Sequence, residues 1–539
     1  MELIYSFTLA LVLTIALTPL LIKFSTHLGL LDTPDEARKV HTKVMPRTGG
    51  LGIIFGALIP LFFLLPLSTQ LLHLLYGCTI IVLFGLLDDR VQLSYKWKLF
   101  GQGCAAIVVI SGGFTFTEIP LFGAYECPEW LAYGITFFFI VGIVNGVNFS
   151  DGMDGLAAGT TLLVLFLLAI LAYHAGNATY TIISLTVAGG VLGFLRFNTF
   201  PAQLFMGDSG SQFLGFVTCC LAIGITQANT SAYSIALPLL LLGLPIMDIL
   251  QVVVVRIVKR LPLPGPDKEH LHHQIARLGF EHYSVVAIIY IVQFTLLASA
   301  YFLRYENDSL IIAFFAAYFI AVVSAVFGMQ AINWKWRHSS ENAERERRNL
   351  FLRKLEGFYR HSPLVVEMLL VLFLLYSALS ILEVPSSIAV GSLLLGVLML
   401  VLTISRKNLP QLMARVWVYP SFAVVAYLLA LGVAGPRVVM LANLLIAVLA
   451  VILVMAMRMS RRQDFSLNTM DLLIVLVVIC LPLLPLDTIS DVNARQGAMH
   501  LLVLLYASEF ILTRKNQNAR LLLLGAPIAL FVVGIQGLI

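Results

Sequence analysis

Apolar stretches of about 18 residues or more recur from one end of this chain to the other, and each is long enough to cross a bilayer as a helix. Of the 539 residues, 59% are hydrophobic and only 12% are charged. A soluble chain of this length carries roughly 25% charged residues, because it must cover its surface. The sequence therefore predicts an all-α polytopic membrane protein with no long soluble domain.

The apolar stretches predict eighteen spans in two groups. The first eleven lie near residues 3–22, 48–66, 71–87, 99–113, 130–147, 156–174, 178–195, 210–228, 232–257, 284–303 and 308–332. The other seven lie near residues 364–382, 386–404, 416–433, 438–457, 468–486, 498–513 and 521–538. The first span has no basic residue before it and no small-residue cleavage site after it, so we expect a retained helix and not a signal peptide.

The distribution of Lys and Arg supports this count. With the N-terminus outside, the loops after odd-numbered spans face the cytosol, where basic residues collect. Of the 34 Lys and Arg residues, all but Arg304, Arg437 and Arg495 fall in those loops or at inside helix ends. One missed or invented span would invert every later loop. We therefore expect a multi-pass protein with both termini outside.

The spans divide the chain into three segments. Residues 1–332 are expected to form a first membrane domain, 333–363 a basic cytosolic linker, and 364–539 a seven-helix extension of unknown role. The linker reads as a solvated helix, with a surface helix drawn to anionic headgroups as the alternative. Glu367 and Glu509, inside apolar runs of the extension, favour helix-packing contacts over a second site.

Polar residues gather in four clusters, each at a helix end or loop that the topology places on the inner face. A midplane carboxylate costs ~2.5–3.5 kcal/mol on insertion scales, so helix ends are where a membrane protein can hold several. The clusters contain Asp88 and Asp89; Asn148, Asp151 and Asp154; Asp208; and His270, His272 and His273. Four such clusters on one face indicate a functional site.

The residue types indicate the chemistry of that site. Carboxylates without Cys ligands favour a hard cation that prefers oxygen, such as Mg2+, with Mn2+ as a substitute. Such a cation commonly shares its site with substrate phosphates. A zinc site at the histidines is the alternative, although zinc normally has a fixed tetrahedral ligand set. A transporter is the rival class, but its acids are expected near the midplane of inverted repeats, and no such repeat is visible.

At these residues the sequence resembles the polyprenyl-phosphate N-acetylhexosamine-1-phosphate transferases. This superfamily is glycosyltransferase family 4, and it includes WecA-type enzymes and phospho-MurNAc-pentapeptide translocases. The shared motifs, within residues 1 to about 332, are RKVHTKVMPRTGG, GLLDDR, NGVNFSDGMDGLAAG, FMGDSGSQFLG and PDKEHLHHQIARLG. The resemblance implies a membrane enzyme with a cytosolic cleft, in which UDP-sugar and polyprenyl phosphate give polyprenyl-diphosphate-sugar and UMP.

The resemblance also assigns roles around the phosphates. Asp208 and Asn148 are implied as the ligands of Mg2+. Asp88 is implied to deprotonate or position the lipid phosphate, with Asp89 beside it, and Lys98 resembles a phosphate-binding lysine. We expect direct attack by the lipid phosphate and no covalent aspartyl-phosphate, because that phosphate is already ionised near neutral pH.

The remaining roles concern the sugar donor. Asp151 and Asp154 are implied to border the uridine side of the cleft, and His270, His272 and His273 to hold the diphosphate or the sugar. Three residues of the first inside loop are further substrate-binding candidates: Lys39, His41 and Arg47.

The histidine loop indicates the subfamily. PDKEHLHH is similar to the WecA-type loop, which favours a UDP-N-acetylhexosamine, UDP-GlcNAc first, over the pentapeptide translocase reaction. The resemblance thus implies a protein of the bacterial inner membrane that starts a lipid-linked surface glycan such as O-antigen, with no nucleic acid partner. Two departures are Gln92, where the family pattern has Asp or Lys, and the unmatched residues 364–539. The options for those extra helices are a docking platform, for a second copy in a homodimer or a glycan-assembly partner, and an appended bundle that handles lipid.

Overall fold

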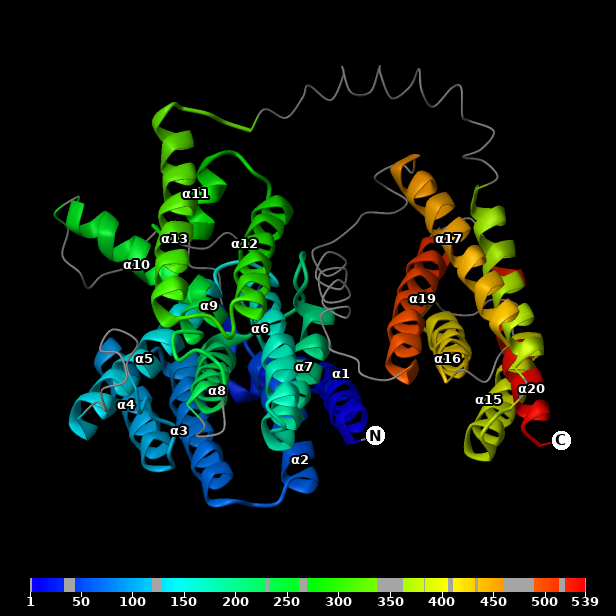
Figure 1. The fold of residues 1–539 in the computed structure, drawn as a ribbon, viewed down its shortest axis with the longest axis horizontal. Helices are drawn as coiled ribbons and strands as arrows, with labels where there is room; N and C mark the ends of the chain where they lie inside the picture. Colours follow the sequence, from blue (N-terminus) through cyan, green and yellow to red (C-terminus); the bar gives the residue numbers. More distant parts are fainter. Residues whose placement is uncertain are drawn as a thin grey trace. The chain divides into compact units, whose positions relative to one another are not determined.

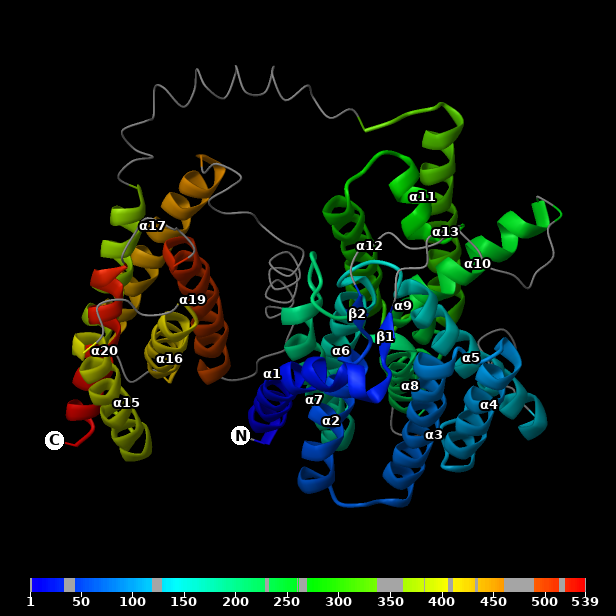
Figure 2. The same ribbon diagram turned by 180° about the vertical axis from the view of Figure 1, so that it is seen from behind.

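The computed structural model describes residues 2–32, 44–118, 128–227, 232–258, 260, 269–336, 362–381, 383–405, 411–431, 435–459, 489–512 and 519–538. The described residues up to 336 form one compact unit, and those from 362 onward form a second. Both are helical (Figures 1 and 2). The only strands in the described ranges, β1 (Leu31–Asp32) and β2 (Met45–Pro46), form an antiparallel pair in the first unit.

The helices of the first unit follow the apolar stretches of the sequence. They are α1 (Glu2–Leu28), α2 (Gly49–Leu64), α3 (Thr69–Val91), α4 (Tyr95–Ser111), α5 (Glu129–Ser150), α6 (Leu156–His174), α7 (Ala178–Asn198), α8 (Gly207–Thr226), α9 (Pro238–Leu241), α10 (Gly243–Val258), α11 (Leu271–Arg277), α12 (His282–Phe302) and α13 (Asp308–Ala331).

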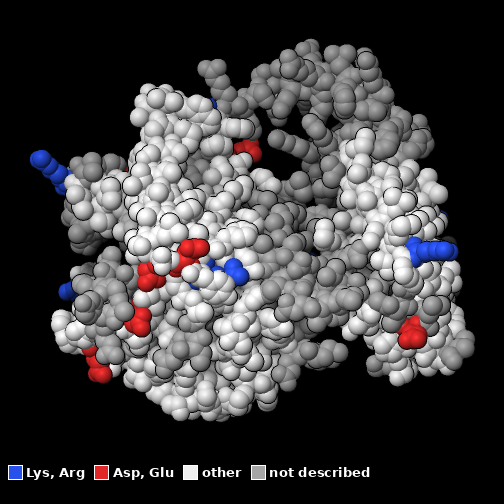
Figure 3. All heavy atoms as spheres, viewed as in Figure 1, with Lys and Arg blue, Asp and Glu red and all other residues white. Residues whose placement is uncertain are grey.

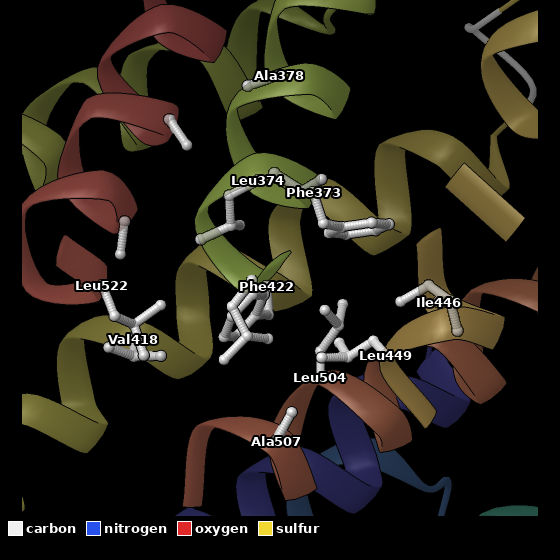
Figure 4. Close-up of a cluster of buried hydrophobic side chains, with 14 of the residues drawn as sticks. Phe373, Leu374, Ala378, Val418, Phe422, Ile446, Leu449, Leu504, Ala507 and Leu522 are labelled. Atoms are coloured by element: carbon white, nitrogen blue, oxygen red, sulfur yellow. The ribbon is translucent and has the colours of Figure 1, made fainter. Parts of the chain in front are cut away.

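The second unit is also a helical bundle. It contains the helix Ser362–Ser380, α15 (Ser386–Ser405), α16 (Gln411–Ala430), α17 (Pro436–Met459), α19 (Ile489–Leu512) and α20 (Arg520–Gln536). Figure 4 shows side chains such as Phe373, Phe422 and Leu504 meeting in its apolar core. The buried Glu367 accepts a hydrogen bond from the backbone N–H of Leu522, 3.1 Å away, so this acid contacts the first turn of α20.

Ten helices in the described part of the chain are long and apolar enough to cross a membrane. The all-α polytopic membrane fold is therefore confirmed. The count of eighteen spans stays a prediction, since several helices are shorter and the span near 468–486 lies outside the described residues. In Figure 3 charged side chains are few among the coloured atoms, and several acidic ones gather with basic ones on one part of the first unit.

The interior of the first unit consists mainly of α6, α7 and α8. In their most apolar windows, 89%, 78% and 94% of residues are buried, against 17% for α1 and α13. A helix that is hydrophobic all round is typical of such a position. Asp208 lies in the first turn of α8, so the candidate site lies at the end of the most buried helix.

One predicted span was wrong in its continuity. The stretch 232–257 is not a single helix, because it breaks at Leu242 between α9 and α10. The reason is Pro245, which has no backbone N–H to donate to the carbonyl four residues earlier, that of Leu241. That carbonyl accepts a 3.3 Å hydrogen bond from Gln293 Nε2 of α12 instead. Beyond the break α10 projects from its unit (Figures 1 and 2).

Candidate active site

Asp89 holds the beginning of α8. Its carboxylate Oδ1 accepts a 2.8 Å hydrogen bond from the backbone N–H of Asp208. Oδ2 accepts from the backbone N–H of Ser209 at 3.1 Å and from the Ser209 hydroxyl at 2.8 Å. The first N–H groups of a helix have no partner within the helix, and an anion is stabilised there. Asp89 thus caps α8 from α3, and its side chain is only 4% exposed.

Glycines bring the ends of three helices into backbone contact at the same place. A Cβ atom on Gly85 of α3 would lie 2.5 Å from Ser209 Cα, and one on Gly50 of α2 would lie 2.5 Å from Gly210 N. The backbone N–H of Gly50 donates to the carbonyl of Met206 at 2.8 Å. No other residue type fits at Gly85 or Gly50 without a backbone shift. The motifs RTGG, GLLDD and GDSG therefore form a single structural element.

Asp88 and Asp208 face one ammonium group. Lys98 Nζ of α4 lies 2.8 Å from Asp208 Oδ2 and also contacts Asp88 Oδ2. Asn148 Nδ2 of α5 donates to Asp208 Oδ1 at 3.1 Å. Asp88 is 3% exposed, whereas the Asp208 and Lys98 side chains are 28% and 32% exposed. Four residues from four helices thus meet at the edge of the bundle.

The turn after α3 fixes Asp88. Gln92 adopts a left-handed conformation (φ 52°) and its N–H donates to the Asp88 carbonyl at 2.9 Å. This reversal directs the N–H of Leu93 toward Asp88 Oδ1, at 2.7 Å. Gln92 therefore shapes the turn through its backbone, although it departs from the family pattern.

The oxygens of this cluster fit Mg2+. The two carboxylates and the amide oxygen of Asn148 are hard ligands, and Mg2+ typically takes one or two protein carboxylates plus water and substrate phosphates. Lys98 supplies the positive charge that two adjacent carboxylates require. In the described residues no three His, Cys, Asp or Glu side chains form a complete metal cage. The donor set suits a cation shared with a phosphorylated substrate.

A layer of buried amides lies one helical turn below the cluster. Gln102 and Gln212 follow Lys98 and Asp208 by four residues, and Asn145 precedes Asn148 by three. Asn145 Nδ2 donates to Gln102 Oε1 at 2.6 Å, and Gln102 Nε2 donates to Gln212 Oε1 at 3.2 Å. These bonds join α4, α5 and α8, the three helices that carry Lys98, Asn148 and Asp208. The layer therefore fixes the rotation of each helix about its axis.

The two aspartates of the turn after α5 have different environments. Asp154 Oδ2 accepts from the Ala202 N–H at 3.0 Å, and its own N–H donates to His282 Nε2 at 3.2 Å. Asp154 thus fixes the turn. No hydrogen bond to the Asp151 carboxylate occurs among the described residues, and burial, followed by the negative charge of Asp208, raises its pKa well above the ordinary value. Asp151 is therefore the member of the pair whose carboxylate does not hold the turn.

The histidine loop packs against the turn that carries Asp151. His270 Nδ1 lies 2.7 Å from Asp248 Oδ2, and the His270 and His272 rings stack 6.0 Å apart. A Cβ atom on Gly152 would lie 2.6 Å from His272 Nε2. Burial lowers the pKa of His272 to about 3, so this imidazole is neutral at physiological pH. The His273 ring lies 4.1 Å from that of His272. The three histidines are therefore not equivalent as phosphate ligands.

The segment between α1 and α2 is described only in part. Arg47 Nη2 lies 2.8 Å from Asp32 Oδ1, which connects the end of β2 to β1. Lys39 and His41 lie outside the described residues. The positive charge of Arg47 partly offsets the effect of burial on the pKa of Asp151.

Several residues of the site were not identified from the sequence. They are the amides Gln102, Asn145, Asn198 and Gln212, the carboxylate Asp248, and His282. Most are polar side chains within apolar helices, where a polar group requires a partner or a function. A polar side chain within an apolar helix is visible in the sequence, so these residues could have been named as candidates. The sequence does not show which of them bond to one another.

We expect the Asp89→Asn variant to lose both stability and activity. The amide keeps one acceptor and places an N–H2 group against a backbone or hydroxyl donor, at a cost of about 1–3 kcal/mol. That corresponds to a roughly 10- to 100-fold effect if it falls on the active geometry. Thermal unfolding and turnover measured together test this. Ser209→Ala, which removes only the hydroxyl bond, should show a smaller loss of both, and equal losses would contradict the capping role.

Two carboxylates, an amide and a lysine that meet at the edge of a helical membrane bundle suit a divalent cation and the oxygens of a phosphate. The model of "glycosyl transferase family 4" matches residues 71–226, which include α3 to α8. A probable undecaprenyl-phosphate N-acetylglucosaminyl 1-phosphate transferase of Bacillus subtilis is 34% identical over 341 residues, covering 62% of this chain and 94% of that protein. The chain belongs to this family of membrane transferases.

Two further relatives act on different substrates by name and differ in their identity to this chain. A decaprenyl-phosphate N-acetylglucosaminephosphotransferase of Mycobacterium tuberculosis is 33% identical, covering 50% of this chain and 74% of that protein. A phospho-N-acetylmuramoyl-pentapeptide-transferase of Clostridium perfringens is 29% identical, covering 54% of this chain and 94% of that protein. The family match lies entirely in the first unit.

Proposed function

We propose that this chain transfers N-acetylglucosamine 1-phosphate from UDP-GlcNAc to a polyprenyl phosphate and releases UMP. The observation that carries the proposal is the convergence of Asp88, Lys98, Asn148 and Asp208. The relatives of Bacillus subtilis and Mycobacterium tuberculosis, at 34% and 33% identity, support the donor sugar, because both are more similar to this chain than the pentapeptide-transferase of Clostridium perfringens, at 29%.

The reaction is a displacement at phosphorus. An oxygen of the lipid phosphate bonds to the phosphorus that carries the sugar, and the bond from that phosphorus to the bridging oxygen breaks. UMP departs with the bridging oxygen. Such a transfer depends on in-line positioning and neutralisation of charge more than on covalent help from the protein. A covalent aspartyl-phosphate is not part of the proposal.

Each residue has a role in this displacement. Asp208 and Asn148 would hold Mg2+, or Mn2+ in its place, which when bound neutralises diphosphate charge. Lys98 lies between the two carboxylates and binds a phosphate oxygen once substrate arrives. Asp88 orients the lipid phosphate. Asp89 positions Asp208 through the start of α8 and is thus a positioning residue.

The donor occupies the other side of the site. Asp151 borders the uridine, while Asp154 holds the turn in place. His270 and His273 face the diphosphate, and the neutral His272 contributes packing. Arg47 lies on this side as well. The site opens to the cytosol of a bacterial inner membrane, and the extension, residues 364–539, supports a dimer or a glycan-assembly partner.

An exchange assay tests the proposal. Purified full-length protein is incubated with polyprenyl phosphate, Mg2+ and a panel of UDP-sugars, and UMP release and the lipid product are measured. We expect release with UDP-GlcNAc that depends on both the lipid and the divalent ion. UMP release only with UDP-MurNAc-pentapeptide would show that the chain catalyses the pentapeptide-transferase reaction instead. No UMP release with any donor would refute the proposal.

A further inference from the structure

Asp248 is the single acidic residue of α10, and it is almost completely buried. The helix sequence is GLPIMDILQVVVVRIV, and Asp248 is 3% exposed. An acid within an apolar membrane helix costs ~2.5–3.5 kcal/mol on insertion scales. Such a residue is retained where it has a partner and a task.

Both carboxylate oxygens of Asp248 contact the histidine loop. Oδ2 lies 2.7 Å from His270 Nδ1, and Oδ1 accepts from the N–H of Leu271 at 2.7 Å. The second bond places the backbone next to His270, and the first fixes the ring itself. An imidazole held this way has one ring orientation, with an Nδ1–H directed at the carboxylate and Nε2 directed away from it.

The position of this ring affects the rest of the site. The ring of His270 contacts the ring of Phe149, with centroids 5.2 Å apart. Phe149 is the residue that follows Asn148 on α5. On its other side the ring of His270 stacks on His272 with an interplanar angle of 7°. Because the ring of His272 abuts Gly152, the orientation of His270 sets how the whole loop meets the turn that carries Asp151.

We propose that Asp248 is a positioning residue that orients His270 and stabilises its positive charge, so that His270 Nε2 donates to a phosphate oxygen of the nucleotide donor. This rests on the proposed function, in which the donor is a nucleoside diphosphate sugar. A carboxylate bonded to Nδ1 favours the protonated imidazole, and the diphosphate requires a cationic donor. Among the described residues, the ring of His272 lies beside that of His270, and the ring of His273 lies next to that of His272.

Gln251 offers a matched control. It lies three residues after Asp248 on the same helix, is 2% exposed, and its Nε2 donates to the carbonyl of Glu269 at 2.9 Å. Gln251 therefore anchors the same loop from the same helix, at the residue before His270. If anchoring of the loop were all that Asp248 provides, Gln251→Met would have the same consequences as Asp248→Asn.

Kinetics of four full-length variants test the proposal: Asp248→Asn, His270→Gln, the double variant and Gln251→Met. We expect Asp248→Asn to lower kcat/KM by roughly 10- to 100-fold, as for other carboxylates that support a functional histidine. In the His270→Gln background the same change should cost no more than about twofold, because a residue that acts only through His270 has nothing left to support. Two independent sites would instead give losses that multiply, with free energies that add to within ~0.5 kcal/mol. Losses that multiply, or an equal loss in Gln251→Met, would overturn the proposal.

A chemical readout separates this proposal from the proposed function. Diethylpyrocarbonate modifies neutral imidazoles, and mass spectrometry of peptides reports the rate at His270 whether or not the protein is active. Without the carboxylate the neutral ring is favoured, so Asp248→Asn should react roughly tenfold faster, and Gln251→Met should react like the wild type. Equal rates in Asp248→Asn and wild type would refute the pairing. Loss of UMP release by the wild type would refute the proposed function alone.

Discussion

The Asp208→Asn variant is expected to lose sugar-phosphate transfer by roughly a thousandfold or more while remaining folded. A metal ion supplies several kcal/mol of charge stabilisation, and about 4 kcal/mol corresponds to a factor of ~10³ in rate. The change removes one of the two carboxylate charges and leaves the backbone N–H of residue 208 bonded to Asp89. The side chain of Asp208 is 28% exposed, so the core does not depend on it.

Two measurements check the Asp208→Asn result. Turnover in the exchange assay should fall, and calorimetric titration with Mg2+ or Mn2+ should show weakened binding without any substrate conversion. Glu129→Gln is the control, because Glu129 lies in the first turn of α5, at the end opposite Asn148. If Asp208→Asn kept both the activity and the ion affinity of the wild type, Asp208 would not be a ligand of the metal.

Replacing Lys98 by Met should also abolish most activity, but it should change metal binding in the opposite direction. Charged hydrogen bonds contribute ~1.5–3 kcal/mol each, so loss of the ammonium from the phosphates is expected to lower kcat/KM by at least about 100-fold. Removing the cation leaves Asp88 and Asp208 without their shared counter-charge. The affinity of the free protein for a divalent ion should therefore rise or stay constant.

Lys96→Met is the matched control for Lys98→Met. Lys96 lies on the same helix two residues earlier, and its side chain is exposed. It should keep wild-type kinetics. If Lys98→Met weakened the binding of the divalent ion as Asp208→Asn does, Lys98 would be a structural support of the metal site and not a ligand of the phosphates.

The sequence predicted the membrane fold and the members of the central cluster, for a simple reason. Helix ends on one face of a membrane lie in one plane, so acids placed there are neighbours in a small bundle. The contacts themselves required the structure. Lys98 and Asp208 are 110 positions apart, as are Gln102 and Gln212, and nothing in the periodicity of an apolar helix indicates which partner it faces.

The errors and omissions have the same origin. The break at Leu242 depends on Pro245 together with a side chain from α12, and a hydropathy pattern averages over both. Asp89 and Asp88 are adjacent and chemically identical, yet one caps α8 and the other contacts Lys98. Asp248 lies in the middle of an apolar run and its partner His270 follows only after a loop, so the sequence does not reveal the pair.

The glycine contacts among α2, α3 and α8 limit how this enzyme can diversify. Where even a methyl group has no room, the distance between Asp88 and Asp208 is fixed by main-chain atoms, and drift in surrounding side chains leaves it unchanged. The opposite wall, with the Asp151 turn and the histidine loop, is joined through side chains and can vary. Preference for a different sugar nucleotide should therefore arise by substitutions in that wall, while the phosphate-transferring half is inherited intact.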